Sequence, residues 1–190
     1  MRALTLGLAL ALAPVLSATS ACSTTSSLQL IAPGATAPDF RAPDQTGAMR
    51  TLAEFKGRPL VVFFYPKDGT PGCTKEACAF RDAWQSYQER GIGIVGVSAD
   101  DVASHARFAD EHKLPFPLLA DVDGAVARAF GVDTKFGMME RVTVLVDKDG
   151  VVQQTWPDVD PGVHAAQILA VAAPAPTPAP ASPSPAAPSP

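Results

Sequence analysis

Residues 60–65 form an unbroken apolar run, Leu-Val-Val-Phe-Phe-Tyr. A strand with one face in water alternates apolar and polar residues, so this run predicts a strand that is buried on both faces. A second apolar run covers residues 92–98, and a helix predicted over about 73–90 separates the two. Buried strands that alternate with helices indicate an α/β fold. The apolar stripe of the predicted helix comprises Cys73, Ala77, Phe80, Trp84 and Tyr87, and Gly91 ends it.

The elements that follow continue this alternation and end in a hairpin. The hairpin reverses the direction of the chain, so the predicted fold is an α/β sandwich whose central β-sheet is mixed and flanked by helices. We predict a helix from Asp100 or Asp101 to about Lys113, a strand at 118–120, a helix at about 124–130, a hairpin of strands 141–146 and 151–156 around the turn 147–150, and a closing helix at 162–172.

The distribution of charge marks the limits of the folded domain. Apart from Arg2, no charged residue lies before Asp39 or after Asp160. Residues 34–172 hold 14 basic and 19 acidic residues, a net charge of −5, which is the composition of an ordinary globular domain. The basic surface of a nucleic-acid-binding protein is absent. Three cysteines in 190 residues also exclude a disulfide scaffold.

The first 21 residues have the pattern of an export signal. An Ala- and Leu-rich run follows Arg2, but it is shorter than the roughly 20 residues of a membrane-spanning helix. Small residues then precede Cys22, as in a bacterial lipobox, although Thr19 stands where an aliphatic residue is usual. An ordinary signal peptidase could use the same residues. We expect a protein that is exported to the periplasm or anchored to the membrane through lipid on Cys22.

The segments on either side of the predicted domain are expected to lie outside its fold. Residues 22–33 are predicted to be a Ser/Thr-rich tether. Residues 173–190 contain Pro, Ala, Ser and a single Thr, which predicts a disordered tail with extended conformers. Contact with a membrane is expected only through the lipid anchor.

The loop between the first predicted strand and the first predicted helix contains the candidate catalytic residues. Two prolines and two glycines between Tyr65 and Cys73 make a tight connection at the carboxyl end of a strand, where open α/β sheets bind ligands. Cys73 falls in the first turn of the helix, where the unpaired backbone N–H groups and the helix dipole favour a thiolate. A thiolate is the species that attacks. A buried structural cysteine is the alternative, since Cys73 also lies on the apolar stripe.

The pattern Pro66-x-x-x-Thr70-x-x-Cys73 resembles the active-site motif of peroxiredoxins, which are thiol peroxidases with a thioredoxin-like fold. Glu76 and Cys78 extend the resemblance to the branch of the bacterioferritin co-migratory protein, or peroxiredoxin Q.

Two further segments carry the same resemblance. Residues 34–40, Gly-Ala-Thr-Ala-Pro-Asp-Phe, resemble the first segment of the peroxiredoxin domain, and Arg141 at the start of a strand matches the family's arginine. The similarity spans about 34–172. It implies a thioredoxin-like fold and reduction of hydrogen peroxide or organic hydroperoxides without a metal or organic cofactor.

The resemblance also implies a role for each motif residue. Cys73 is the expected nucleophile, and Thr70 can hydrogen-bond the thiolate and the peroxide. Arg141 can stabilise the thiolate and the developing negative charge. Pro66 would shield the sulfur from water without offering a donor. Glu76 either orients Arg141 or simply occupies the first turn of the helix.

Oxidation of Cys73 to a sulfenic acid calls for a second thiol. Cys78 is expected to capture it in an intramolecular disulfide; the alternative is that Cys78 is a small buried apolar residue and that resolution is intermolecular. A thioredoxin-like dithiol would then reduce the disulfide, and in an oxidising periplasm this requires a dedicated partner. We expect a monomer.

Other functions fit the cysteine and histidine spacing less well. A thiol–disulfide oxidoreductase is the alternative function, but such proteins typically carry a C-x-x-C motif, whereas Cys73 and Cys78 form C-x-x-x-x-C. A copper-delivery protein would want C-x-x-x-C and a distal histidine, and His164 lies late in the chain. His105, His112 and His164 lack partners at metal spacing, so they are predicted to be solvated helix positions. Trp84 and Trp156 are predicted to lie in the core.

Overall fold

The computed structural model describes residues 28–172. The predicted export signal, Cys22 and the whole Pro-rich tail lie outside the described residues, so the predictions for them stay predictions. Residues 28–33 of the predicted tether are described: Leu30 and Ile31 pack against the core, and the N–H of Ile31 donates to the carbonyl of Phe130 over 3.0 Å.

β3 (Leu60–Phe64) is the middle strand of a five-stranded sheet and is buried along its whole length, as its apolar run predicts. It pairs in parallel with β4 (Gly93–Ser98), which pairs in parallel with β5 (Leu118–Ala120). On its other side it pairs antiparallel with β8 (Val142–Val146), which continues into β9 (Val152–Trp156) through a hairpin. The strand order β5-β4-β3-β8-β9 confirms the predicted mixed sheet.

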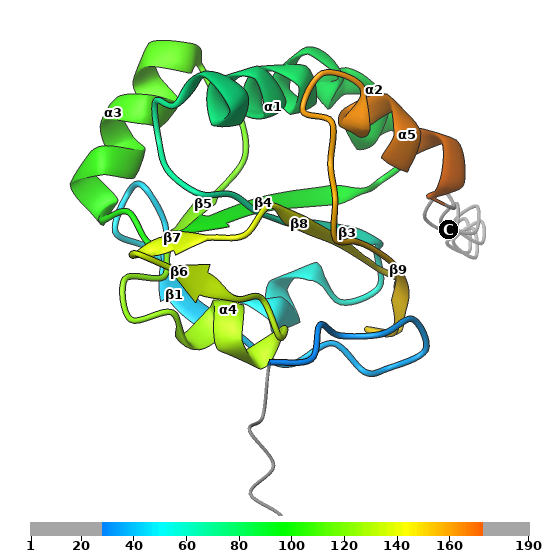
Figure 1. Cartoon of the computed structure of the whole chain (residues 1–190). Coiled ribbons are helices and arrows are strands. Elements are labelled where there is room, and N and C mark those ends of the chain that lie inside the picture. The colour runs from blue at the N-terminus through cyan, green and yellow to red at the C-terminus, as the bar shows by residue number, and fades with distance from the viewer. Residues whose placement is uncertain (1–27, 173–190) are drawn as a thin grey trace, which may run out of the picture.

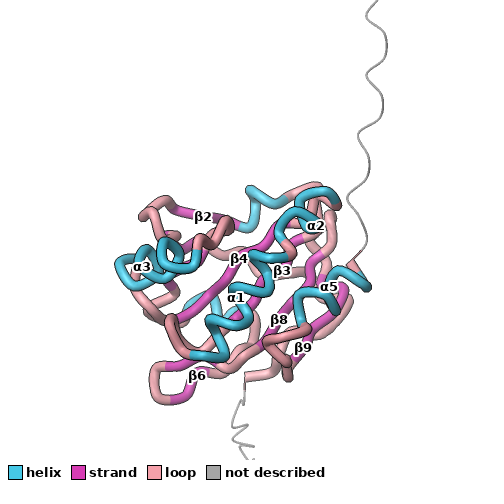
Figure 2. The backbone as a smooth tube through the Cα atoms, turned by 90° about the horizontal axis from the view of Figure 1, so that it is seen from above, coloured by secondary structure: helices cyan, strands magenta, loops and turns pink. Residues whose placement is uncertain are grey.

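Helices cover one face of the sheet and a smaller layer covers the other (Figure 1). The first layer holds α1 (Pro71–Asp82), α2 (Trp84–Glu89), α3 (Val102–His112) and α5 (His164–Val171). Seen from above, α1 lies over β3 and β4 between α3 and α5 (Figure 2). The opposite layer holds β1 (Arg41–Pro43), β2 (Met49–Thr51), the 3-10 helix η1 (Leu52–Phe55) and α4 (Ala125–Ala129). A small hairpin pairs β6 (Thr134–Lys135) with β7 (Met138–Met139).

The pleat of β3 divides its side chains between two apolar cores. Val61 and Phe63 pack under the four-helix layer, whereas Val62 and Phe64 pack against the opposite layer. Each core is therefore continuous with the sheet, and the helix-side core includes Cys73.

Two details of the predicted helix over 73–90 differ from the structure. The helix begins earlier, at Pro71, because proline fits the first helical position, where its missing N–H costs nothing. It is also broken into α1 and α2 at Ala83, whose N–H points at the carbonyls of both Ala79 and Arg81.

The predicted exposure of two histidines is wrong. His105 and His164 are fully buried, and His112 is half-buried. His105 faces the Asp68 carboxylate and a backbone carbonyl, while His164 packs edge-on against Trp156. Among the described residues, no three or more His, Cys, Asp or Glu side chains gather in a way that could hold a metal ion.

The two tryptophans lie at the margin of the core and not within it. Trp84 and Trp156 are half-buried and pack against the helix-side core from outside. In the part of the chain that the structure describes, no helix is both long enough and apolar enough to cross a membrane.

Candidate active site

Cys73 is the third residue of α1, directly after the loop that leaves the end of β3. The loop turns sharply at Gly69, whose φ of +69° lies in the region that favours glycine. Thr70 then takes an extended conformation as the N-cap and Pro71 starts the helix. The Cys73 side chain is only 1% exposed and faces the helix-side core. The sulfur is therefore shielded from water and lies in the turn where the helix dipole favours an anion.

Arg141 reaches the sulfur from the neighbouring strand. Val142 pairs with Phe64 across β8 and β3, which places Arg141 beside the loop that leads to α1. Its Nη2 lies 3.2 Å from Sγ of Cys73. A Cβ at position 72 would lie 3.2 Å from the same nitrogen, so Gly72 leaves the guanidinium the room that it occupies.

Glu76 holds the other arm of the guanidinium. Nη1 of Arg141 donates to Oε2 of Glu76, which lies one turn further along α1. The carboxyl group is 1% exposed, and within residues 28–172 its Oε1 has no hydrogen-bond partner. Of the two alternatives for Glu76, the structure shows the contact with Arg141. The guanidinium thus bridges a thiol and a carboxyl group with one donor for each.

Burial decides the protonation of Glu76. Desolvation raises the pKa of Glu76 to about 7, although the Arg141 cation opposes this shift. Desolvation also acts to lower the pKa of Arg141, but attraction to Glu76 and Cys73 outweighs it and the net shift is upward. Arg141 therefore remains a cation while Glu76 titrates near neutral pH.

We expect Glu76→Gln to remove a pH dependence from stability. Because the pKa of Glu76 is about 7 in the folded chain against 4.5 for a free carboxyl, the folded state binds more protons between these values. The free energy of unfolding of the wild type should therefore fall by about 3 kcal/mol as the pH rises through this window. Urea unfolding of both proteins at several pH values measures the difference, and the exposed Glu111→Gln serves as the control. The same slope in wild type and Glu76→Gln contradicts the prediction.

Thr70 and Pro66 lie in the loop that leads from β3 to Cys73. The Thr70 hydroxyl donates to the carbonyl of Lys67 over 3.0 Å, which leaves its oxygen lone pairs as acceptors. Pro66 is half-buried and, with Lys67, lines a hollow of about 380 Å³ that the exposed Phe136 also borders. In the described structure Thr70 therefore bonds its own loop, and the sulfur has Arg141 as its hydrogen-bond donor.

Cys78 lies on the same helix as Cys73 but is not next to it. Both thiols are free, Cys73 buried and Cys78 half-buried, and α1 runs without a break through both. Five residues of helix separate their Cα atoms by a rise of about 7.5 Å and a rotation of about 140°. The structure thus brings Cys73, Arg141 and Glu76 together and keeps Cys78 apart.

Three residues that shape the site were missed from the sequence. Gly72 makes room for Arg141. Asp68, in the loop before α1, contacts His105 on α3. A signal for His105 was available, since it shares a helical stripe with Phe108 and Ala109 and such a stripe faces a core.

A buried thiol at a helix N-terminus, paired with an arginine on a thioredoxin-like fold, defines the class as a thiol-based peroxidase. The chain belongs to the AhpC/TSA family, whose sequence profile matches residues 33–155.

Relatives that match most of the folded region are peroxiredoxins. A protein named peroxiredoxin bcp from Coxiella burnetii is 41% identical over 143 residues, which are 72% of this chain and 95% of the relative. Peroxidoxin BcpB from Mycobacterium tuberculosis is 40% identical, with a TM-score of 0.69 over 73% of this chain and 94% of that chain. The bacterioferritin comigratory protein of Xanthomonas campestris is 37% identical, with a TM-score of 0.67 over 74% and 94%.

These relatives confirm the resemblance to the branch of the bacterioferritin co-migratory protein and peroxiredoxin Q. The protein is a thiol-dependent peroxidase with an antioxidant function, and peroxiredoxins reduce peroxides with electrons from thioredoxin-like reductants.

Proposed function

We propose that Cys73 is the nucleophile of the peroxidase reaction. Its thiolate attacks one peroxide oxygen, the S–O bond forms and the O–O bond breaks with both electrons passing to the leaving oxygen. Sulfur is oxidised to the sulfenic acid, and the leaving oxygen departs as water or an alcohol after it takes up a proton. The observation that carries this assignment is the 3.2 Å contact between Sγ of buried Cys73 and the Arg141 guanidinium.

Each neighbour of the sulfur has a defined task in this proposal. Arg141 offsets the negative charge of the thiolate and then that of the leaving oxygen, because its fork of donors stays cationic throughout. Glu76 fixes the second arm of the fork, so the first arm points at the sulfur. Thr70 accepts a hydrogen bond from the peroxide through its free lone pairs. Pro66 narrows the approach to the sulfur without offering a donor.

Arg141→Lys is expected to slow the oxidation of Cys73 by about a hundred-fold, the range seen when one donor to a developing oxyanion is lost. An ammonium group cannot bridge two acceptors with the geometry of the guanidinium. The measurement is the second-order rate of thiol loss in a single turnover with hydrogen peroxide, with the exposed Arg128→Lys as the matched control. A wild-type rate in Arg141→Lys removes this residue from the site.

The substrates proposed are hydrogen peroxide and organic hydroperoxides. The structural study of the Xanthomonas campestris relative concerns its alkyl peroxide reduction activity, and the hollow beside Pro66 offers apolar surface from Phe136 and Met138 next to the loop. Because the sulfur is almost fully buried, we expect peroxides whose O–O group is unhindered, such as hydrogen peroxide and linear alkyl hydroperoxides.

The later steps of the proposed cycle regenerate the thiol. Cys78 resolves the sulfenic acid as a disulfide, and a thioredoxin-like dithiol reduces that disulfide. The protein acts as a monomer.

We further propose that the protein is exported to the periplasm and anchored through lipid on Cys22. The support is the apolar run after Arg2, followed by small residues before a lone cysteine. A single acyl chain binds membranes only weakly, so stable anchoring needs more than one chain.

Labelling of cells with a palmitate analogue tests the anchor. We expect label on the wild-type protein and its complete loss in Cys22→Ala, with Cys78→Ala as the control that keeps it. An unlabelled wild type, or equal label on Cys22→Ala, contradicts lipidation of this residue.

A further inference from the structure

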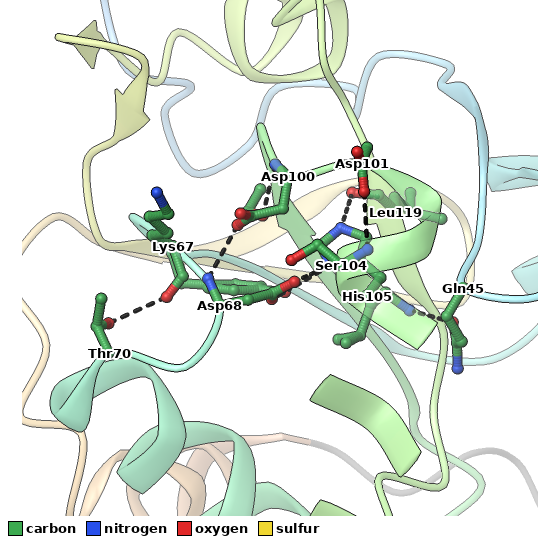
Figure 3. A network of polar contacts seen from close by, with 12 residues as sticks. Gln45, Lys67, Asp68, Thr70, Asp100, Asp101, Ser104, His105 and Leu119 are labelled. Carbon is green, nitrogen blue, oxygen red and sulfur yellow. Dashed lines mark hydrogen bonds and ion pairs between the residues drawn. The ribbon is translucent and has the colours of Figure 1, made fainter. Parts of the chain in front are cut away.

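A buried polar network ties the loop before α1 to α3 and β5 (Figure 3). At its centre His105 is fully buried, with Nδ1 2.9 Å from Oδ2 of Asp68 and Nε2 3.1 Å from the carbonyl oxygen of Leu119. A carboxylate and a carbonyl oxygen only accept hydrogen bonds, whereas a neutral imidazole has a single N–H donor. A neutral ring would direct a lone pair at one of these oxygens. The two acceptor oxygens therefore point to hydrogen on both ring nitrogens, the imidazolium form of His105.

The surroundings of Asp68 favour its ionised form. Its Oδ1 accepts a hydrogen bond of 2.8 Å from the Tyr65 hydroxyl, and its Oδ2 faces His105. Burial acts to raise the pKa of Asp68, but the hydrogen bonds and charge of His105, with the bond from Tyr65, outweigh it and the pKa is lowered. Asp68 and His105 thus form a buried ion pair that joins the loop to α3.

The backbone of the loop is held at the same point. The N–H of Asp68 donates to Oδ2 of Asp100 over 2.9 Å, and that oxygen also accepts a bond of 2.7 Å from Ser98 at the end of β4. The preceding carbonyl, that of Lys67, accepts the hydroxyl of Thr70. The peptide between Lys67 and Asp68 therefore sets where the Thr70 oxygen points, and Thr70 stands at the N-cap position of the helix that carries Cys73.

We propose that Asp68 and His105 are a positioning pair for the peroxide reaction. The ion pair fixes the loop so that the Thr70 oxygen and the first turn of α1 face the peroxide at Cys73. Neither residue touches the sulfur in the structure, so their effect acts through Thr70 and the loop. The proposal rests on the proposed role of Cys73 and adds two residues to it.

The test compares three variants with a matched control. His105→Gln replaces the two ring nitrogens by one amide nitrogen and one acceptor oxygen, and Asp68→Asn removes the anion. His112→Gln changes a half-buried histidine on the same helix. In a single turnover with hydrogen peroxide, each of the first two should lose at least about ten-fold in the rate of Cys73 oxidation, as a small displacement of reacting groups does. The double variant should lose no more than the worse single variant, because the two residues act as a unit. His112→Gln should keep the wild-type rate.

A second rate separates positioning from general damage. Alkylation of Cys73 by iodoacetamide needs the thiolate but not an oriented Thr70, so it should change far less than the peroxide rate in both variants. Equal losses in the two rates contradict a positioning role. A second outcome is that Cys73 of the wild type reacts with peroxide and that His105→Gln and Asp68→Asn react as fast as His112→Gln. This outcome contradicts the positioning role of the pair and leaves the proposed nucleophile unaffected. A wild type whose Cys73 does not react overturns the proposed function itself.

The charge of His105 can be measured on the wild-type protein, without any variant. Nitrogen NMR of the imidazole at pH 7 should show hydrogen on both Nδ1 and Nε2. A neutral ring, with one unprotonated nitrogen, rejects the ion pair on which the proposal stands.

Discussion

Cys73→Ser is expected to lower peroxide consumption by at least about a hundred-fold, because the nucleophile is lost and the remaining groups have nothing to activate. A serine hydroxyl stays protonated at neutral pH even beside Arg141, so it cannot attack the O–O bond. The replacement is close in size and can accept the same hydrogen bond from Nη2, so the fold should persist. Steady-state consumption of hydrogen peroxide with a dithiol reductant gives the rate, and circular dichroism shows whether the variant is folded.

The matched control for this experiment is Cys22→Ser, which makes the same chemical change outside the described residues. It should consume peroxide at the wild-type rate. A folded Cys73→Ser protein that keeps more than a tenth of the activity would place the nucleophile elsewhere.

Cys78→Ser should react once with peroxide at the wild-type rate and then stop. The first step needs only the site around Cys73, whereas the later steps need a thiol to capture the sulfenic acid. Without capture, a second peroxide oxidises the sulfur to the sulfinic acid, so the variant should become inactive at peroxide levels that the wild type survives. Single-turnover thiol loss and multiple turnovers with a dithiol, measured on the same preparation, separate the two steps.

The wild type must deform to make this disulfide. Cα atoms more than about 7 Å apart rarely accept a disulfide, and Cβ atoms rotated by about 140° point apart, so the bond cannot form on the continuous α1. The first turns of α1 must unwind, and amide exchange over residues 73–85 should rise when the protein is oxidised. Peptide mass mapping should find Cys73 joined to Cys78. An oxidised protein without this crosslink, or with exchange equal to the reduced form, contradicts intramolecular resolution; Cys73→Ser exposed to the same peroxide is the control.

The central sheet could be predicted because its signals are local. β3 and β4 are buried on both faces, and that burial favours apolar or small residues along the whole strand whatever their partners. The β8–β9 hairpin was marked by its Asp-Lys-Asp-Gly turn. By contrast, β1, β2, β6 and β7 are two or three residues long and are defined by their partners, as when Arg41 pairs with Thr51. Strands this short have no periodicity to detect.

The same distinction between local and long-range signals applies to the active site. Cys73 and its place in the first turn of a helix followed from residues within ten positions of one another. The contacts that complete the site cross the fold: Arg141 lies 65 positions from Glu76 and 68 from Cys73, and His105 lies 37 from Asp68. A motif resemblance pointed to Arg141 but not to its geometry. In the sequence, only the apolar Phe108 and Ala109 at helical spacing distinguished His105 from an exposed histidine.

Glu76 belongs to α1, the helix that has to open for the proposed Cys73–Cys78 disulfide to form. In the closed helix its pKa is about 7, and on opening its carboxyl group enters water and its pKa falls toward the ordinary value of 4.5. Between about pH 4.5 and 7 the opening therefore releases a proton in addition to those released by the two thiols. By linkage, acid conditions then favour the dithiol over the disulfide more strongly than thiol chemistry alone requires. Under the proposed resolution by Cys78, the equilibrium between dithiol and disulfide would thus depend on pH through a carboxyl group that takes no part in either reaction.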